Sequence, residues 1–266
     1  MPQFPVESID DPRLACYRDL SERNLTRQSG LFVAEGEKVV ERLVASDFVV
    51  ASILGEPAFA EKYEPRVPGE TPIYVASREL LRATVGFNFH RGVVACGRRK
   101  PAIGIDQILA RMRQRQATVV VCPDVQDPTN LGSIIRSTAA FGCDAILLGR
   151  KCADPFSRRV LRVSMGAAVQ LPIVESADLA ADLVALGGAG FETIAAVIDS
   201  AAEPLANTER GVRIALLLGS EGHGLEAVWL ELAQRRVTIP MQPGIDSLNV
   251  SVAAAVLLYH FCRTPT

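Results

Sequence analysis

From residue 117 onward, short apolar runs alternate with stretches of helical periodicity. Continuous apolar runs of this kind are typical of parallel strands that are covered by helices on both faces. The pattern therefore predicts a doubly wound α/β domain. The expected strands are residues 118–122, 145–148, 169–174, 193–198, 214–218 and 237–239. The expected helices are residues 132–141, 156–165, 177–186, 225–234 and 248–261.

The N-terminal third predicts a smaller mixed α/β unit. Its expected strands are residues 31–34, 48–54, 73–76 and 92–96, and its expected helices are residues 12–20, 36–45 and 77–84, with Ser77 as a cap. Residues 56–71 predict a loop with a short helical piece. The basic segment 98–104 is broken by Pro101 and Gly104 and is the best candidate linker. We therefore divide the chain into a domain at 1–100, a linker at 101–116 and a domain at 117–266.

The bulk composition excludes several classes of protein. A content of 48% hydrophobic and 22% charged residues is that of a folded protein and not of a disordered one. The longest apolar stretches fall far short of the roughly 20 residues that cross a bilayer. The N-terminus carries acidic residues and prolines where a signal peptide needs a basic start and an apolar run. We expect a cytosolic protein with no membrane association.

The cysteines and histidines predict no metal centre. The six cysteines contain no CxxC pair, and a chain of this length does not need disulfides, so we expect reduced thiols packed in the core. The three histidines are far apart and lack partners at zinc-ligand spacing.

Basic residues are concentrated in two segments although the net charge is −2. The first segment contains Arg91, Arg98, Arg99, Lys100, Arg111, Arg113 and Arg115, and the second contains Arg150, Lys151, Arg158, Arg159 and Arg162. These clusters are explained either by solvated surface or by local contact with nucleic-acid phosphates.

Three polar loops follow buried strands and lead into helices, at residues 124–136, 216–225 and 239–253. Open α/β sheets bind ligands outside the carboxyl ends of their strands, so these loops are placed to form a site. Taken singly, each has a plainer explanation. Asn130, which we place before its helix, and Ser247, which we place at the start of the last helix, are both explained as helix caps. Arg136 is explained as a surface helix residue.

The glycines of the second loop are explained, without further context, as a tight turn. Their spacing matches neither G-x-G-x-x-G nor a P-loop, so a nucleotide-phosphate site is disfavoured.

Together, the three loops resemble the signature motifs of the SpoU family of RNA ribose methyltransferases, within the SPOUT superfamily. The matching residues are Asn130, Gly132 and Arg136 in N-x-G-x-x-x-R; Gly219, Glu221 and Gly224 in G-x-E-x-x-G; and 239–241 with 247–251 in I-P-M and S-L-N-V-S. The Ser-Met-Gly-Ala and Leu-Pro sequences within 162–172 also look like the family, and the resemblance covers about residues 117–262. One departure is Pro243, which stands where many relatives have glycine.

The resemblance implies a trefoil-knotted domain with a mainly parallel sheet, in which the C-terminal segment threads through a loop. It implies S-adenosyl-L-methionine (AdoMet) as cofactor, and an apolar, backbone-rich cleft suits that molecule. It also implies a homodimer. The implied cofactor contacts are Leu218, Gly219, Ile239, Met241, Ser247 and Leu248.

The family's principal catalytic residue corresponds to Arg136. Because arginine keeps its proton in proteins, we expect it to stabilise an oxyanion and to orient a phosphate rather than to act as a base. We expect Asn130, Ser247 and Asn249 to hydrogen-bond the ribose and the loops, and Glu221 to fix the second loop.

Residues 31–40 resemble, more weakly, the small L30e-like substrate-binding domain of many SpoU enzymes. Asn24, Arg27 and Lys38 are candidate RNA contacts there, beside Arg136. The expected substrate is structured RNA, with ribosomal RNA favoured over transfer RNA. The alternatives are an RNA-binding module without catalysis and a dinucleotide-dependent oxidoreductase, and the absent glycine fingerprint disfavours the latter.

Overall fold

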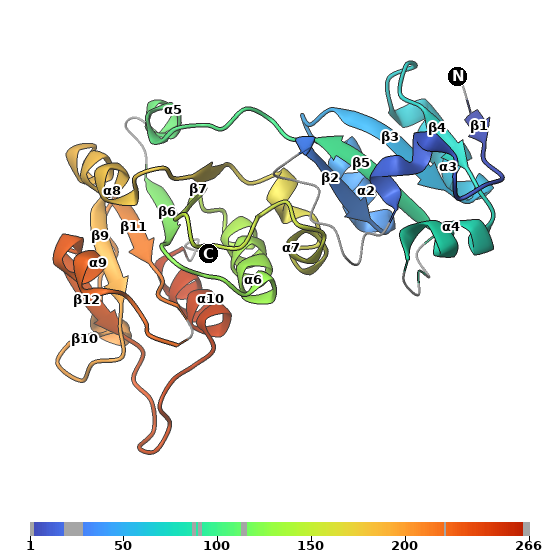
Figure 1. Cartoon of the computed structure of the whole chain (residues 1–266). Coiled ribbons are helices and arrows are strands. Elements are labelled where there is room, and N and C mark those ends of the chain that lie inside the picture. Colours follow the sequence, from blue (N-terminus) through green and yellow to red (C-terminus); the bar gives the residue numbers. More distant parts are fainter. Residues whose placement is uncertain are drawn as a thin grey trace. The chain divides into compact units, whose positions relative to one another are not determined.

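The computed structural model describes residues 3–18, 29–86, 89, 92–112, 116–220 and 222–262 (Figure 1). The chain divides into two compact units. The first comprises Met1–Pro101 with Phe156–Gln170, and the second comprises Ala102–Pro155 with Leu171–Thr266. None of the helices within the described ranges is long and apolar enough to cross a membrane.

The first unit is built on a mixed sheet in the order β1-β4-β3-β5-β2. Its strands are β1 (Gln3–Pro5), β2 (Leu31–Glu35), β3 (Val50–Gly55), β4 (Ile73–Val75) and β5 (Val93–Arg98). β4 pairs in parallel with β1 and β3, whereas β5 pairs antiparallel with β2 and β3. The predicted mixed α/β character is confirmed, although β1 was not predicted.

The helical elements in the described part of residues 1–101 are η1 (Pro12–Tyr17), α2 (Glu37–Val44), α3 (Pro57–Tyr63), η2 (Glu64–Arg66) and α4 (Arg78–Val85). The predicted cap of α4 is confirmed, because Ser77 accepts a hydrogen bond from the backbone N–H of Leu80. Part of the core lies where η1 and α4 meet the sheet, and there the buried Tyr17 hydroxyl lies 2.6 Å from Ser52 Oγ.

Residues Phe156–Gln170 pack with the first unit although they follow β7 in the chain. They include α7 (Arg158–Val163) and η3 (Ala167–Val169). Arg158 forms an ion pair of 3.3 Å with Glu35, whose side chain is only 4% exposed. Arg42 donates to the carbonyl of Met165 at 2.7 Å. These contacts fasten the segment to β2 and α2.

The second unit contains a sheet in the order β10-β12-β9-β11-β6-β7-β8, and every pair of neighbours is parallel. Its strands are β6 (Ala117–Cys122), β7 (Ala145–Leu148), β8 (Ile173–Glu175), β9 (Glu192–Ala196), β10 (Glu203–Pro204), β11 (Arg213–Leu217) and β12 (Arg235–Thr238). The predicted parallel sheet is therefore confirmed.

Helices cover both faces of this sheet. They are α5 (Ile105–Arg111), α6 (Pro128–Ala140), α8 (Leu179–Gly188), α9 (Ala227–Leu232) and α10 (Val250–Phe261), with the turn η4 (Leu205–Asn207). Val119 and Val121 of β6 share a core cluster with α5 and α8. Because strand side chains alternate between faces, the buried Val120 points to the other face. On that face α6 and α10 pack against each other.

Several predicted elements were wrong in extent. The strand expected at 169–174 begins only at Ile173, because Ala167–Val169 forms the 3-10 turn η3. The predicted helix at 12–20 is the 3-10 helix η1 over its described part. α6 begins at Pro128, four residues earlier than expected. α5 and β10 were not predicted, and α5 lies inside the range 101–116 that we assigned to a linker.

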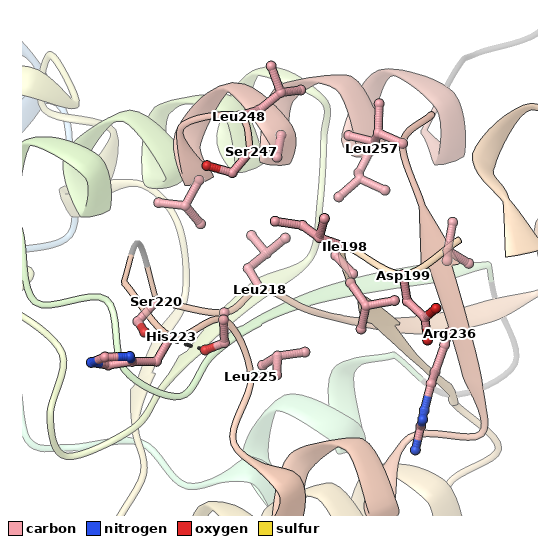
Figure 2. A pocket seen from close by; sticks show the side chains of 18 of the residues that line it. Ile198, Asp199, Leu218, Ser220, His223, Leu225, Arg236, Ser247, Leu248 and Leu257 are labelled. Carbon is pink, nitrogen blue, oxygen red and sulfur yellow. Dashed lines mark hydrogen bonds between the residues drawn. The ribbon is translucent and has the colours of Figure 1, made fainter. Parts of the chain in front are cut away.

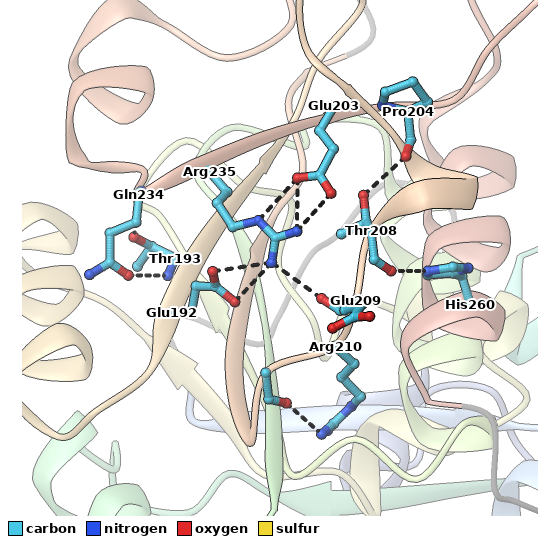
Figure 3. A network of polar contacts seen from close by, with 11 residues as sticks. Glu192, Thr193, Glu203, Pro204, Thr208, Glu209, Arg210, Gln234, Arg235 and His260 are labelled. Carbon is cyan, nitrogen blue, oxygen red and sulfur yellow. Dashed lines mark hydrogen bonds and ion pairs between the residues drawn. The ribbon is translucent and has the colours of Figure 1, made fainter.

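A polar network holds one edge of the sheet (Figure 3). Arg235 at the start of β12 donates to Glu203 of β10 at 2.8 Å and to Glu192 of β9 at 3.2 Å. It also donates to the carbonyl of Glu209 at 3.2 Å. The carbonyl of Thr208 lies 2.8 Å from His260 Nε2 on α10. The network thereby ties the excursion between β9 and β11 to the sheet and to the last helix.

Candidate active site

A cavity of about 630 Å³ lies at the carboxyl ends of β9, β11 and β12 (Figure 2). It is lined by residues 196–199 and by some of the residues in the ranges 218–225 and 236–248. The first turns of α10 form a further wall. Its volume falls within the roughly 300–1,000 Å³ range of small-molecule sites. Leu218, Ile198 and Leu257 present aliphatic side chains around it. The cavity is the kind of site that parallel sheets form at this edge.

The loop after β11 is a tight turn that also lines the cavity. Ser220 and Gly224 exchange backbone hydrogen bonds of 2.9 and 3.1 Å, and Gly224 has φ 65°. A Cβ on Gly219 would lie 2.4 Å from the backbone carbon of Gly224, so only glycine fits there. The turn brings its glycines and the side chains of Ser220, His223 and Leu225 to this part of the cavity (Figure 2).

The loop between β12 and α10 closes another side of the cavity. Ile239, Met241, Ser247 and Leu248 contribute to the lining. The plainer explanation of Ser247, a cap of α10, is wrong. The cap is Asn249, whose Oδ1 accepts from the backbone N–H groups of Ser251 and Val252 at 2.9 and 3.4 Å. The helix therefore starts two residues after the expected position.

The start of α6 is bonded to the start of α10. Asn249 Nδ2 donates to Asn130 Oδ1 at 2.9 Å. We predicted Asn130 before the helix, but it lies in the first turn of α6. The cap is Asp127, which accepts from the N–H groups of Thr129 and Asn130. The first and third polar loops therefore meet at one place.

The match to a family model decides the identity of the chain. The model of the SpoU rRNA Methylase family matches residues 117–259, which is more than half of the chain. The chain belongs to the SpoU rRNA Methylase family. The match covers β6 to α10 and includes all three loops of the site.

Relatives across the whole chain agree with the SpoU family. An uncharacterised tRNA/rRNA methyltransferase of Mycobacterium bovis is 40% identical over 96% of this chain and 90% of its own length. The 23S rRNA (guanosine(2553)-2'-O)-methyltransferase RlmP of Bacillus subtilis is 30% identical over 96% of this chain and 98% of its own.

Solved structures share the fold. An AdoMet-bound rRNA methyltransferase from Sinorhizobium meliloti aligns with a TM-score of 0.84 at 22% identity, over 97% of both chains. The SpoU methyltransferase AviRb from Streptomyces viridochromogenes aligns with a TM-score of 0.77 at 26% identity, over 93% of this chain and 95% of the other. The predicted fold class of SPOUT methyltransferases is therefore confirmed. The knot and the L30e-like character of the first unit stay predictions.

The six residues predicted to contact the cofactor of SpoU enzymes all line the cavity. They are Leu218, Gly219, Ile239, Met241, Ser247 and Leu248. SpoU enzymes use AdoMet as methyl donor. The position of these residues agrees with the predicted role, which itself stays a prediction.

The predicted catalytic and RNA-contacting residues are brought together only in part. Asn130 and Asn249 meet, but neither lines the cavity. Arg136 is exposed on α6, more than two turns after the start of the helix. Lys38 is exposed on α2 of the first unit. The remaining predicted residues, Glu221, Asn24 and Arg27, lie outside the described residues.

Residues 196–199 form a wall of the cavity that was not predicted from the sequence. We predicted a strand at 193–198, but β9 ends at Ala196, and the exposed Asp199 lay outside the predicted strand. Arg236 on β12 was also missed. For residues 196–199 the available signal was their place at the carboxyl end of a parallel strand. Within the described residues, no group of three or more His, Cys, Asp or Glu side chains forms a metal site.

Proposed function

We propose that this chain is an AdoMet-dependent methyltransferase that methylates the ribose 2'-hydroxyl of a nucleotide in structured RNA. The observation that carries the proposal is the meeting of the family's motif loops. Loops two and three line one cavity, and the Asn249–Asn130 hydrogen bond joins loop three to loop one, which leads to Arg136. Ribosomal RNA is the favoured substrate, because relatives such as the B. subtilis enzyme carry that activity in their names.

The cavity suits the cofactor in the chemistry of its lining. Leu218, Ile239 and Leu248 supply apolar surface for an adenine ring and a methionine chain. The Gly219–Gly224 turn offers backbone groups at a point where a Cβ would not fit. When bound, AdoMet supplies an electrophilic methyl group on a sulfonium sulfur.

Arg136 is the residue that we assign to the acceptor side. Among the described residues its exposed side chain has no hydrogen bond or ion pair, so the guanidinium is available to a substrate. A guanidinium donates several hydrogen bonds in one plane and fits a phosphate. We infer that Arg136 holds a phosphate of the substrate and stabilises the ribose oxygen as it becomes an alkoxide.

The two asparagines position this acceptor side. Asn249 uses its oxygen to cap α10 and its nitrogen to hold Asn130. The cavity wall on α10 and the helix that carries Arg136 are thereby fixed to each other. Holding reactants in one orientation contributes several kcal/mol to catalysis, up to roughly 7–11 in ideal cases.

We also propose a homodimer that forms through α10. Val252, Val256 and Tyr259 lie one helical turn apart, and they are 49%, 39% and 60% exposed. An exposed apolar stripe of this kind marks an interaction surface. The family resemblance points to a second copy of the chain as the partner.

The first unit is proposed to bind the RNA substrate, with the exposed Lys38 of α2 as a contact. The functions that we assign to the two domains, RNA binding to residues 1–100 and methyl transfer to residues 117–266, stay predictions. The structure adds that Phe156–Gln170 belongs by its contacts to the first unit.

The proposal is tested with methyl-labelled AdoMet and purified ribosomal or transfer RNA. We expect label in 2'-O-methylated nucleotides after nuclease digestion. Arg136→Ala should lower transfer by roughly 10²-fold or more, as loss of an oxyanion donor does. AdoMet binding, measured by calorimetry, should not change. Arg111→Ala on the opposite helical layer is the matched control and should keep full activity.

Three results would contradict parts of the proposal. Full turnover by Arg136→Ala would refute the role of that residue. Label in bases rather than in ribose would refute the 2'-O reaction. Absence of AdoMet binding would favour an RNA-binding module without catalysis.

A further inference from the structure

Helices α6 and α10 are in contact at both of their ends. At their first residues, Asn130 bonds to Asn249. At their last residues, the rings of Phe141 and Tyr259 lie 6.3 Å apart between centroids, and Cys143 Sγ lies 3.8 Å from Cys262 Sγ. The asparagine pair and the cysteine pair have the same sequence separation of 119 residues. The two helices therefore run parallel and in register.

The cysteine pair lies away from the cavity, beside the starts of β6 and β7. Cys143 follows the turn after α6 and is 7% exposed, whereas Cys262 ends α10 and is half-buried. Cys262 Sγ lies 3.7 Å from Thr118 Oγ1. In the thiol form Cys262 donates to this oxygen, which also accepts from Arg210 at 2.8 Å.

The neighbours of Cys262 favour its thiolate form. The hydrogen bond with Cys143 is the largest cause that lowers the pKa of the Cys262 thiol, and Thr118 and the positive charge of Arg210 act in the same direction. Burial and the Asp144 carboxylate oppose them. The thiolate is the form of cysteine that attacks oxidants.

We propose that Cys143 and Cys262 are a modification site, where a peroxide oxidises the two thiols to an intramolecular disulfide that thiols reduce again. The Cys262 thiolate attacks one oxygen of hydrogen peroxide, the O–O bond breaks, and Cys262 becomes a sulfenic acid while the other oxygen leaves as water after protonation. The sulfur of Cys143 then attacks Cys262 Sγ. The S–S bond forms, and the sulfenic hydroxyl leaves as a second water with the proton of Cys143.

The disulfide would close a loop of 119 residues and fasten the end of α10 to the end of α6. The first turns of α10 line the cavity, so the link acts on the helix that forms one of its walls. A link between such distant residues restricts the unfolded chain, so the oxidised protein should unfold at a higher temperature. The inference does not depend on the proposed methyl transfer.

The test treats the purified full chain with equimolar hydrogen peroxide and reads the intact mass under non-reducing conditions. The wild type should lose the mass of two hydrogens, and peptide mapping should find Cys143 linked to Cys262. Dithiothreitol should restore both the mass and the original unfolding midpoint. Cys143→Ser and Cys262→Ser should form no link.

Cys152→Ser is the matched control, because Cys152 is a buried thiol that donates to the carbonyl of Cys122 at 3.0 Å. It should form the link as the wild type does. Cys16 and Cys96 also contact each other in the first unit. Oxidation that joins only those two residues, or that converts Cys262 to a sulfinic acid without a link, would overturn the proposal. If the linked protein unfolded at the same temperature as the reduced protein, the proposed effect of the disulfide on α6 and α10 would be wrong.

Discussion

Asn249 Nδ2 donates to Asn130 Oδ1 at 2.9 Å, and this single hydrogen bond joins two helix starts that are 119 residues apart. The oxygen of the same Asn249 amide caps α10. One side chain therefore both begins the last helix and fixes it to α6, which carries Arg136. The relationship brings together motif residues that are distant in sequence.

Replacing Asn249 should therefore weaken two features at once. Asn249→Ala removes the cap and the link to Asn130, and we expect a loss of about 1–2 kcal/mol in the free energy of unfolding, since caps alone contribute about 0.5–2 kcal/mol. Asn130→Ala removes the link but leaves the cap of α10 in place, so it should have a smaller effect. Urea unfolding at neutral pH measures both.

Ser247→Ala is the control for this series. Ser247 is exposed and caps nothing, so its removal should change stability by less than about 0.5 kcal/mol. The effect of Asn130→Ala should shrink in the Asn249→Ala background, because the two residues share one bond. Additive effects would show that the bond contributes nothing.

Gly219 should tolerate no side chain, whereas Gly222 should tolerate one. A Cβ on Gly219 would meet the backbone of Gly224 at 2.4 Å, and backbone atoms of a tight turn cannot move aside cheaply. We expect Gly219→Ala to lower stability by about 1–3 kcal/mol and to weaken AdoMet binding in calorimetry. Gly222 has open space around its Cβ position, so Gly222→Ala should resemble the wild type. Equal behaviour of the two variants would contradict the geometry.

The Arg235 network should make part of the stability depend on pH. The hydrogen bonds from Arg235 hold the pKa of Glu203 below its ordinary value. A carboxyl group whose pKa is lowered by folding stabilises the folded state at pH values above its unfolded pKa, which is about 4.3 for glutamate. This stabilisation is lost as the pH falls through the folded-state pKa. Arg235→Met lacks this contribution.

The difference in unfolding free energy between wild type and Arg235→Met should therefore be largest near neutral pH and should shrink in acid. Urea unfolding across this pH range measures it. Arg236→Met, at the neighbouring position, is the control. Among the described residues the guanidinium of Arg236 donates only to the carbonyl of Leu230. The difference in unfolding free energy between this variant and wild type should therefore stay constant over the same pH range. A constant difference for Arg235→Met would contradict the assignment.

The proposed dimer should depend on the exposed stripe of α10. Val252→Glu places a charge in an apolar interface, and we expect the variant to elute as a monomer with a mass from light scattering of half that of the wild type. Val184→Glu on α8 is the control, because Val184 is also exposed but lies on another helix. A wild type that is itself monomeric, or a dimeric Val252→Glu, would refute this interface.

The elements with strong local signals were predictable from the sequence. Val119 to Val121 and Leu216 belong to continuous apolar runs, and such runs form buried parallel strands wherever helices cover them. α5 was missed because Pro101 and Gly104 precede it and led us to assign the segment to a linker, although Ile105, Ile108 and Leu109 have the spacing of one helix face. The start of α6 was misplaced because Pro128 was not considered as a first helical residue, a position that proline favours.

The site was predictable in composition but not in its contacts. The motif match identified Leu218, Gly219, Ile239 and Met241, which line one cavity. It did not identify Asn249 as the cap of α10 or Asp199 as part of the wall, since both depend on where a neighbouring element ends.

By itself, the order of apolar runs and motifs in this chain determined a parallel sheet, the family and the loops that would form the site, because strand periodicity and loop chemistry are local properties. Tertiary structure alone decided that Asn130 bonds to Asn249, that Cys143 lies against Cys262, and that residues 156–170 pack with the first unit. These pairings join residues more than a hundred positions apart. The first two depend on how α6 and α10 are stacked on one sheet face, and the third depends on contacts such as the Arg158–Glu35 ion pair, none of which a local pattern encodes.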